Sequence, residues 1–174
     1  MTGAAGETGT PGSGTPATGR PATGTPATGT PAPVLTLPDA HGSPVRLGGP
    51  ADGATLVVFV PFAFSRVCTA ELGELQAHLP ELAAAGVRVR AVSCDPQPAL
   101  RAWAEQDGYG FPLLSDFWPH GAAARAYGVL DEVDGYAQRG SFLLDAGGVV
   151  RWLLVHDAGR ARPFAAYRAA VAAL

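Results

Sequence analysis

The stretch LVVFVPFAFSRVC, residues Leu56 to Cys68, decides how the chain folds. It opens with an unbroken apolar run rich in β-branched side chains, which is typical of a strand buried on both faces. After Cys68, leucines recur at helical spacing, four or three residues apart, as far as Leu82. We therefore expect a central strand that leads into an amphipathic helix, with Cys68 in its first turn and a kink at Pro80.

Strand and helix patterns alternate along the rest of the chain. A Pro, Asp and Gly turn between apolar residues predicts a hairpin over Val34–Leu47, and Val87–Ser93 alternates as a second strand. Asp95 is expected to cap, and Pro96 to begin, a helix that ends at Gly108. The remaining patterns predict a short strand within 111–121, a helix from near Pro119 to Gly128, a hairpin over Ser141–Val155 and a C-terminal helix from Phe164 to Leu174. This order predicts an α/β fold of the thioredoxin-like kind, a central mixed β-sheet with helices on both faces.

Residues 1–33 have a different composition from the rest of the chain. They contain no Val, Leu, Phe, Tyr or Trp, and from Gly14 they repeat a five-residue unit of the type GTPAT. Such a segment buries too little apolar surface to offset the entropy lost on ordering. We expect a disordered low-complexity tail over 1–33 and one folded domain over 34–174. A partner-binding or modified tail is the alternative to plain filler.

Composition excludes several classes of function. The formal net charge is -3 and the charged residues are spread out, so neither nucleic acid nor a membrane surface is an expected partner. We find no apolar run of about 18 residues and no signal peptide, and we expect a soluble cytoplasmic protein. Two cysteines are too few for a disulfide scaffold. The histidines lack ligand spacing and nucleotide motifs are absent, so we expect no metal and no cofactor.

Cys68 is the candidate nucleophile. Ser65 stands at the strand-to-helix junction and is a good N-cap residue, which makes Cys68 the third residue of the helix. There the unpaired backbone amides and the positive end of the helix dipole favour a thiolate. Position alone leaves an alternative open, because free cysteines are often simply buried apolar residues.

The neighbours of Cys68 resemble a known active site. Pro61, Ser65 and Cys68 match the peroxiredoxin motif P-x-x-x-[TS]-x-x-C, and RGSF at 139–142 matches the second-arginine segment of that family. The stretches FVPFAFSRVCTAEL, RAWAEQDGYGFPLLSDFWPHGAAARAYGV and QRGSFLLD resemble the AhpE-type one-cysteine peroxiredoxins of actinobacteria. The resemblance implies the peroxiredoxin form of the thioredoxin-like fold. It also implies that Pro61 shields the cysteine, that Ser65 positions the peroxide, and that Arg139 donates hydrogen bonds to Cys68 and to the peroxide.

Two departures from the wider peroxiredoxin pattern stand beside this match. Ser65 replaces the usual threonine, which keeps the hydroxyl but loses a methyl group, and Thr69 replaces a proline, as in the AhpE-like group. Glu71 is similar to the family glutamate that orients the active-site arginine; a solvated helix carboxylate is the alternative. Trp103 lies near the pocket if the resemblance holds, and otherwise packs in the core or at a dimer interface.

Cys94 is the second thiol, at the end of the second predicted strand. As a resolving cysteine it would condense with a sulfenic acid on Cys68. It does not occupy the resolving position of the peroxiredoxin subgroups, and the alternative is a small buried residue.

The expected function is that of an antioxidant thiol peroxidase. Cys68 would reduce hydrogen peroxide, an organic hydroperoxide or peroxynitrite and become a sulfenic acid that an external thiol reduces. By resemblance, the reductant is mycothiol with a mycoredoxin-type protein, or a thioredoxin. The apolar DFWP turn at 116–119 predicts a homodimer that covers it. The alternatives are a peroxide-sensing switch or holdase chaperone, and a disulfide oxidoreductase, which would normally carry C-x-x-C.

Overall fold

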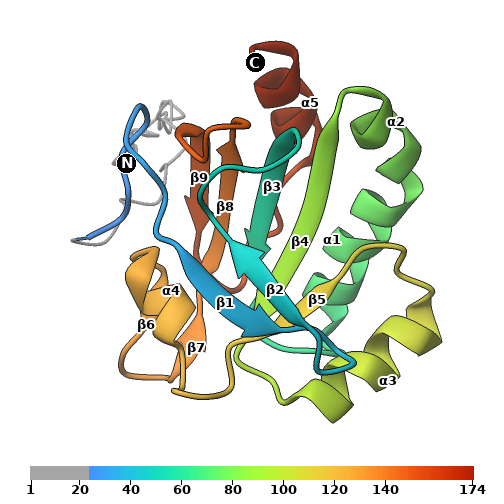
Figure 1. Ribbon diagram of the computed structural model, residues 1–174. Helices are drawn as coiled ribbons and strands as arrows, with labels where there is room; N and C mark the ends of the chain where they lie inside the picture. Colours follow the sequence, from blue (N-terminus) through green and yellow to red (C-terminus); the bar gives the residue numbers. More distant parts are fainter. Residues whose placement is uncertain (1–23) are drawn as a thin grey trace, which may run out of the picture.

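The apolar run that begins at Leu56 forms most of β3 (Ala54–Phe59), the middle strand of a five-stranded sheet (Figure 1). The computed structural model describes residues 24–174. β3 pairs in parallel with β4 (Val87–Ser93) and antiparallel with β8 (Arg139–Leu144). The outer strands are β5 (Leu113–Ser115), parallel to β4, and β9 (Val150–His156), antiparallel to β8. The predicted mixed sheet with a buried central strand is confirmed.

The helix predicted after Cys68 is divided in two. α1 (Arg66–Ala77) ends at His78, and α2 (Leu79–Ala84) begins directly after it with Pro80 in its first turn. A proline cannot continue a helix smoothly, because it has no N–H to donate and its ring meets the carbonyl one turn back. The expected kink at Pro80 is therefore a break two residues earlier.

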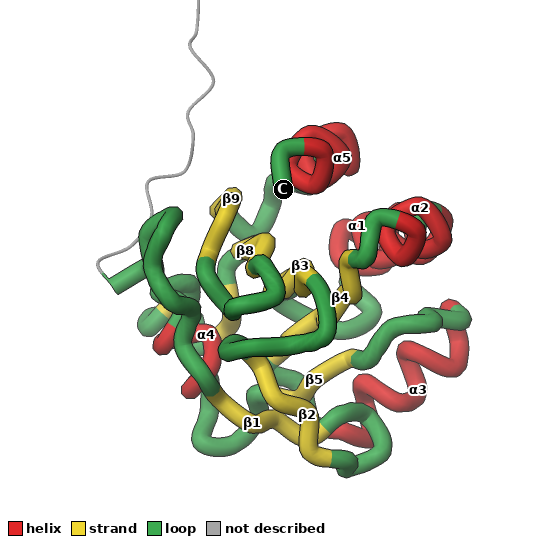
Figure 2. The backbone as a smooth tube through the Cα atoms, turned by 45° about the horizontal axis from the view of Figure 1, so that its top comes forward, coloured by secondary structure: helices red, strands yellow, loops and turns green. Residues whose placement is uncertain are grey.

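The sheet has helices on both of its faces (Figure 2), and a core of buried side chains lies on each face. On one face, α1, α2, α3 (Gln97–Asp107) and α5 (Phe164–Ala172) pack around a core that includes Cys68 and Trp103. Among residues 24–174, the other face carries one short helix, α4, and is completed by two hairpins. The elements of this second layer are α4 (Ala122–Ala126), β1 (Leu35–Pro38), β2 (Pro44–Leu47), β6 (Leu130–Asp131) and β7 (Tyr136–Ala137). Helices on both faces are confirmed, although unequally.

The first turn of α3 differs from the prediction. Its N-cap residue is Pro96, without a side-chain hydrogen bond, and the helix begins at Gln97. The expectation that Asp95 caps this helix is wrong, because its carboxylate is engaged elsewhere, as described below. The expected end at Gly108 is confirmed, where φ of +68° suits a residue without Cβ.

The part of the N-terminal segment that the structure describes, residues 24–33, lies against the edge of the sheet. Gly29 N donates to Val150 O at 2.7 Å, Val150 N donates to Thr30 O at 2.9 Å, and Ala32 N donates to Gly148 O at 2.9 Å. Ala32 is buried, although the segment has no large apolar side chain. The expected boundary after residue 33 is thus too late. The rest of the tail predicted to be disordered, residues 1–23, lies outside the described residues.

Replacing Ala32 tests whether this segment stabilises the domain. We expect Ala32→Asp to lower the free energy of unfolding by about 1–3 kcal/mol, because it places an unpaired charge in a buried site. The same change at exposed Ala27 is the matched control and is expected to have little effect. Urea unfolding of both variants measures the difference; equal free energies would show that residues 24–33 do not stabilise the fold.

Candidate active site

Cys68 is fully buried in the first turn of α1, directly after the loop that leaves β3. Ser65 is the N-cap residue of α1, as predicted, and its Oγ accepts a hydrogen bond from Cys68 N at 3.3 Å. Phe64, just before the cap, has a positive φ of 60°. The loop therefore enters the helix through a backbone conformation that residues other than glycine rarely adopt.

Glu71 lies one turn after Cys68, so the two side chains share a face of α1. Its carboxylate is buried between two buried guanidinium groups. Arg139 Nη1 donates to Glu71 Oε2, and Arg162 Nη2 donates to the same oxygen at 3.0 Å. Arg162 also donates to Oε1, from its backbone N at 2.6 Å and from Nε at 3.1 Å. Glu71 is thus a shared anchor for two cations, and the alternative of a solvated carboxylate does not apply.

Arg139 begins β8 and is held at two of its three side-chain nitrogens. Nε donates to Ala158 O at 2.6 Å, and Nη1 donates to Glu71. Its Nη2 has no hydrogen-bond partner among residues 24–174. Every side-chain nitrogen or oxygen in that range that is fully buried has a hydrogen-bond partner. Because Nη2 has none, this atom must be partly accessible to solvent. One donor of a fixed guanidinium is therefore available to a ligand.

Arg162 is a site residue that the sequence analysis missed. Besides Glu71, its Nη1 donates to the carbonyls of Phe59 and Gly140, both at 2.9 Å, and to Ser141 Oγ at 3.0 Å. One guanidinium therefore joins α1 to β3 and β8. The residue lies in the loop GRARP, where neither periodicity nor a motif separates a buried arginine from an exposed one.

The structure places Pro61 and Trp103 beside the same segment. Pro61 is buried in the loop between β3 and α1. Trp103 is fully buried on α3, and its Nε1 donates to Thr69 Oγ1 at 3.2 Å. Thr69 directly follows Cys68 and stands where the wider family has a proline. Its hydroxyl therefore connects α3 to the first turn of α1.

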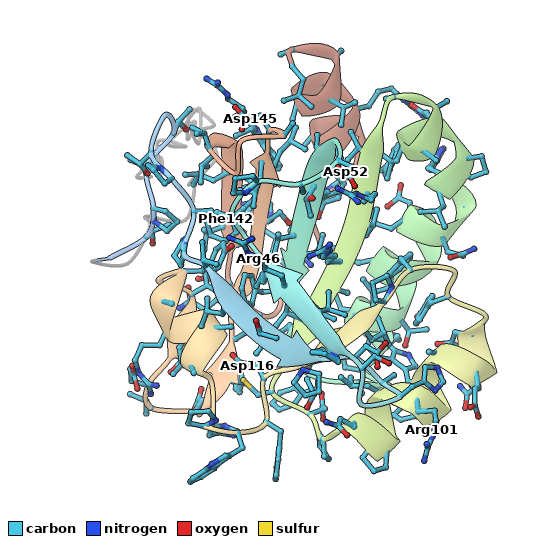
Figure 3. All side chains as sticks on the ribbon, in the orientation of Figure 1. Arg46, Asp52, Arg101, Asp116, Phe142 and Asp145 are labelled. Carbon is cyan, nitrogen blue, oxygen red and sulfur yellow. The ribbon has the colours of Figure 1, made fainter. Side chains whose placement is uncertain are left out.

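Cys94 lies on the other side of the sheet from Cys68. Along β4, Val89 and Ala91 face the core that holds Cys68, whereas Val92 faces the opposite core. Cys94 directly follows β4, and its neighbours include Asp116, Arg125 and Ala137, which belong to the opposite layer or adjoin it. Burial, and after it the carboxylate of Asp116, raises the pKa of Cys94 to about 11. Asp116 follows β5 at the end of the sheet nearest α4 (Figure 3). Both thiols are free, and the structure does not bring them together.

Two negative findings apply to residues 24–174. No group of His, Cys, Asp and Glu side chains there is arranged to hold a metal ion. In the same range, no helix combines the length and the apolar character needed to cross a bilayer.

Comparison with known proteins agrees with this geometry. The AhpC/TSA family matches residues 28–153. Alkyl hydroperoxide reductase E of Mycobacterium tuberculosis is 42% identical over 143 residues, which cover 82% of this chain and 94% of that protein.

Solved structures of related proteins have the same fold. Enterococcus faecalis AhpC superposes with a TM-score of 0.75 at 28% identity, covering 86% of this chain and 92% of that one. Peroxidoxin BcpB from Mycobacterium tuberculosis gives a TM-score of 0.74 at 27% identity, covering 86% and 98% of the two chains. The thioredoxin-like fold predicted from the sequence is thereby confirmed. The chain belongs to the AhpC/TSA family, as a peroxiredoxin enzyme of the alkyl hydroperoxide reductase E type.

Proposed function

We propose that this peroxiredoxin reduces hydroperoxides through Cys68 alone, in a one-cysteine cycle. The Cys68 thiolate attacks one oxygen of the peroxide, the O–O bond breaks, and the other oxygen leaves as water or an alcohol after taking up a proton. The sulfur is oxidised to a sulfenic acid, which an external thiol reduces by way of a mixed disulfide. The observation that carries this proposal is the available Nη2 donor of Arg139. Its guanidinium is held by the buried carboxylate of Glu71, which lies one helical turn after Cys68.

The charges around Cys68 suit this reaction. Arg139 and Arg162 are two buried cations that share one carboxylate, so the cluster has one positive charge in excess. An anionic sulfur, and the negative charge that develops on the leaving oxygen, both balance that excess. Donors fixed before the reaction stabilise the transition state without having to reorganise.

The loop between β3 and α1 supplies the remaining roles that we propose. Ser65 already accepts the amide of Cys68, and its own hydroxyl hydrogen is left to donate to a peroxide oxygen. Pro61 is buried in the same loop, and the role that we propose for it is to limit the access of water to the sulfur. Trp103 holds the first turn of α1 through Thr69, which is a positioning role.

The reductant must come from outside the chain if Cys94 does not resolve. Cys94 lies in the opposite layer, and its raised pKa keeps it protonated at neutral pH. We propose mycothiol with a mycoredoxin-type protein, or a thioredoxin, as the reductant.

The relative's name, alkyl hydroperoxide reductase, supports organic hydroperoxides among the substrates, beside hydrogen peroxide and peroxynitrite. We place the reaction in the cytoplasm.

A homodimer is also part of the proposal. Phe117 and Trp118, in the turn after β5, are 50% and 80% exposed in the single chain. Contiguous exposed apolar surface is typical of a site of protein contact. A second copy that covers this turn would bury both side chains.

Multiple turnover distinguishes a peroxidase from a redox switch or a holdase. We expect the wild type to consume many equivalents of hydrogen peroxide with a thiol reductant, and Cys68→Ser to consume none above background. Cys94→Ser is the matched control and should retain turnover. A single equivalent consumed, followed by a stable oxidised protein with altered partner binding, would contradict the peroxidase proposal in favour of the switch.

Replacing the proposed peroxide donor should reduce the rate and leave the fold intact. We expect Arg139→Lys to lower the second-order rate constant for hydrogen peroxide by about 10²–10³, because one donor aimed at the transition state is lost. The positive charge beside Glu71 remains. Arg125→Lys, at an exposed arginine that pairs with Glu132, is the control. A stopped-flow rate unchanged in Arg139→Lys would remove Arg139 from the reaction.

The pKa of Cys94 predicts a pH dependence. A pKa raised to about 11 means that the folded protein keeps this proton well above neutral pH. In the Cys68→Ser variant, the Cys94 thiolate is then about one molecule in 10⁴ at pH 7. We expect iodoacetamide to label Cys94 very slowly at pH 7, faster as the pH approaches 11, and readily in urea. Rapid labelling of the folded variant at pH 7 would show that Cys94 is reactive.

A further inference from the structure

The loop between β3 and α1 has a conformation that local forces do not favour. Phe64 has φ of 60°, in the left-handed region, which is strained for a residue with a large side chain. Its ring is 47% exposed, so its own burial offsets only part of that strain. The next residue is Ser65, whose hydroxyl holds the amide of Cys68. Ring contacts of Phe62 with Tyr136 and of Phe64 with Trp103 hold the loop through its side chains. A further contact holds its backbone where Ser65 and Cys68 are needed.

Asp95 makes that contact. Ala63 N, immediately before Phe64, donates to Asp95 Oδ2 at 2.7 Å. A hydrogen bond to a carboxylate is stronger than one between neutral groups, so this contact offsets strain at Phe64. The contact joins positions 32 residues apart, from the end of β4 to the loop that follows β3.

Two neighbouring strands hold Asp95 itself. Ser93, the last residue of β4, donates from Oγ to Asp95 Oδ2 at 2.5 Å. Ser115, the last residue of β5, donates from Oγ to Asp95 O at 2.7 Å. Both serines are buried. Asp95 is therefore positioned by two strand ends of the central sheet, its carboxylate by Ser93 and its backbone carbonyl by Ser115.

No other task explains this carboxylate. It does not cap α3, whose N-cap is Pro96. It forms no ion pair with an arginine or histidine among the described residues, in contrast to Asp145 and Glu71. Its hydrogen bonds go to Ser93 and to the backbone of the loop that carries the reactive cysteine.

We propose that Asp95 is a positioning residue for peroxide reduction, which fastens the loop of residues 61–65 to the sheet so that Ser65 and Cys68 stand in register with Arg139. The inference rests on the proposed function for its rate effect. Its structural half, the fastening of Ala63, does not depend on that function. Asp95 touches neither the peroxide nor Cys68 and acts through the backbone of Ala63.

The test compares Asp95→Ala, Asp95→Asn and Asp145→Ala. Asp145 is the matched control, because its carboxylate also accepts loop amides, from Gly147 and Val149, both at 2.9 Å. It lies at the opposite end of the sheet from Asp116, which follows β5 (Figure 3). Because parallel strands end at one edge, the loop after β3 shares the end where Asp116 lies.

The rate readout is the single-turnover reaction of Cys68 with hydrogen peroxide. We expect Asp95→Ala to be slower by about 10–100-fold, since a small misplacement of reacting groups is costly. Asp95→Asn should recover most of the rate, because an amide oxygen can accept from Ala63 and Ser93. Asp145→Ala should lose stability without losing rate. An Asp95→Ala protein that is folded and within threefold of the wild-type rate would overturn the proposal.

A second readout needs neither activity nor a folded variant. In the wild-type protein, the Ala63 N–H should exchange with solvent more slowly than a loop amide that has no hydrogen bond. Exchange of that amide at the rate of an open loop would contradict the fastening, even if Asp95→Ala failed to fold. If the wild type does not react with peroxide but Ala63 is protected, the proposed function fails while the role of Asp95 in positioning the loop stands.

Discussion

The structure depends most on one buried carboxylate. Glu71 accepts hydrogen bonds from both Arg139 and Arg162, and all three side chains are almost fully removed from water. Burying two cations is affordable only with a partner that each can share and with further acceptors for the remaining N–H groups. Arg162 finds those acceptors on β3 and β8, and Arg139 finds one on Ala158. This arrangement fixes α1 against the sheet and leaves one donor of Arg139 for chemistry.

The sequence predicted the framework because its signals are local and periodic. The run from Leu56 and the leucine stripe after Cys68 define a buried strand and a helix in contact with it, and Ser65 has the side chain that an N-cap needs. Peroxiredoxin resemblance then added Arg139 and Glu71, which no spacing rule connects. These candidate site residues could be identified from the sequence because they lie in segments that share either periodicity or a motif.

The parts that could not be predicted are contacts between distant loops. Arg162 lies among other arginines in a loop without pattern, and only the fold shows that it is buried. Asp95 precedes a proline, a pattern that is typical of a helix cap. Its actual partner is the backbone amide of Ala63, which no sequence pattern indicates. Composition places Ala32 in a disordered tail because composition registers large apolar side chains and not the backbone hydrogen bonds that hold the segment on Val150.

The mass of the reduced protein after one equivalent of hydrogen peroxide tests the central claim most directly. If Cys68 reacts beside Arg139 and has no partner thiol in its layer, the intact chain gains one oxygen and forms an adduct with a sulfenic-acid trap. Loss of two hydrogens within the chain would mean that Cys94 reaches Cys68, contrary to the arrangement in which the sheet separates them. No change in mass would contradict the account altogether, and Cys68 would then be only a buried apolar residue of α1.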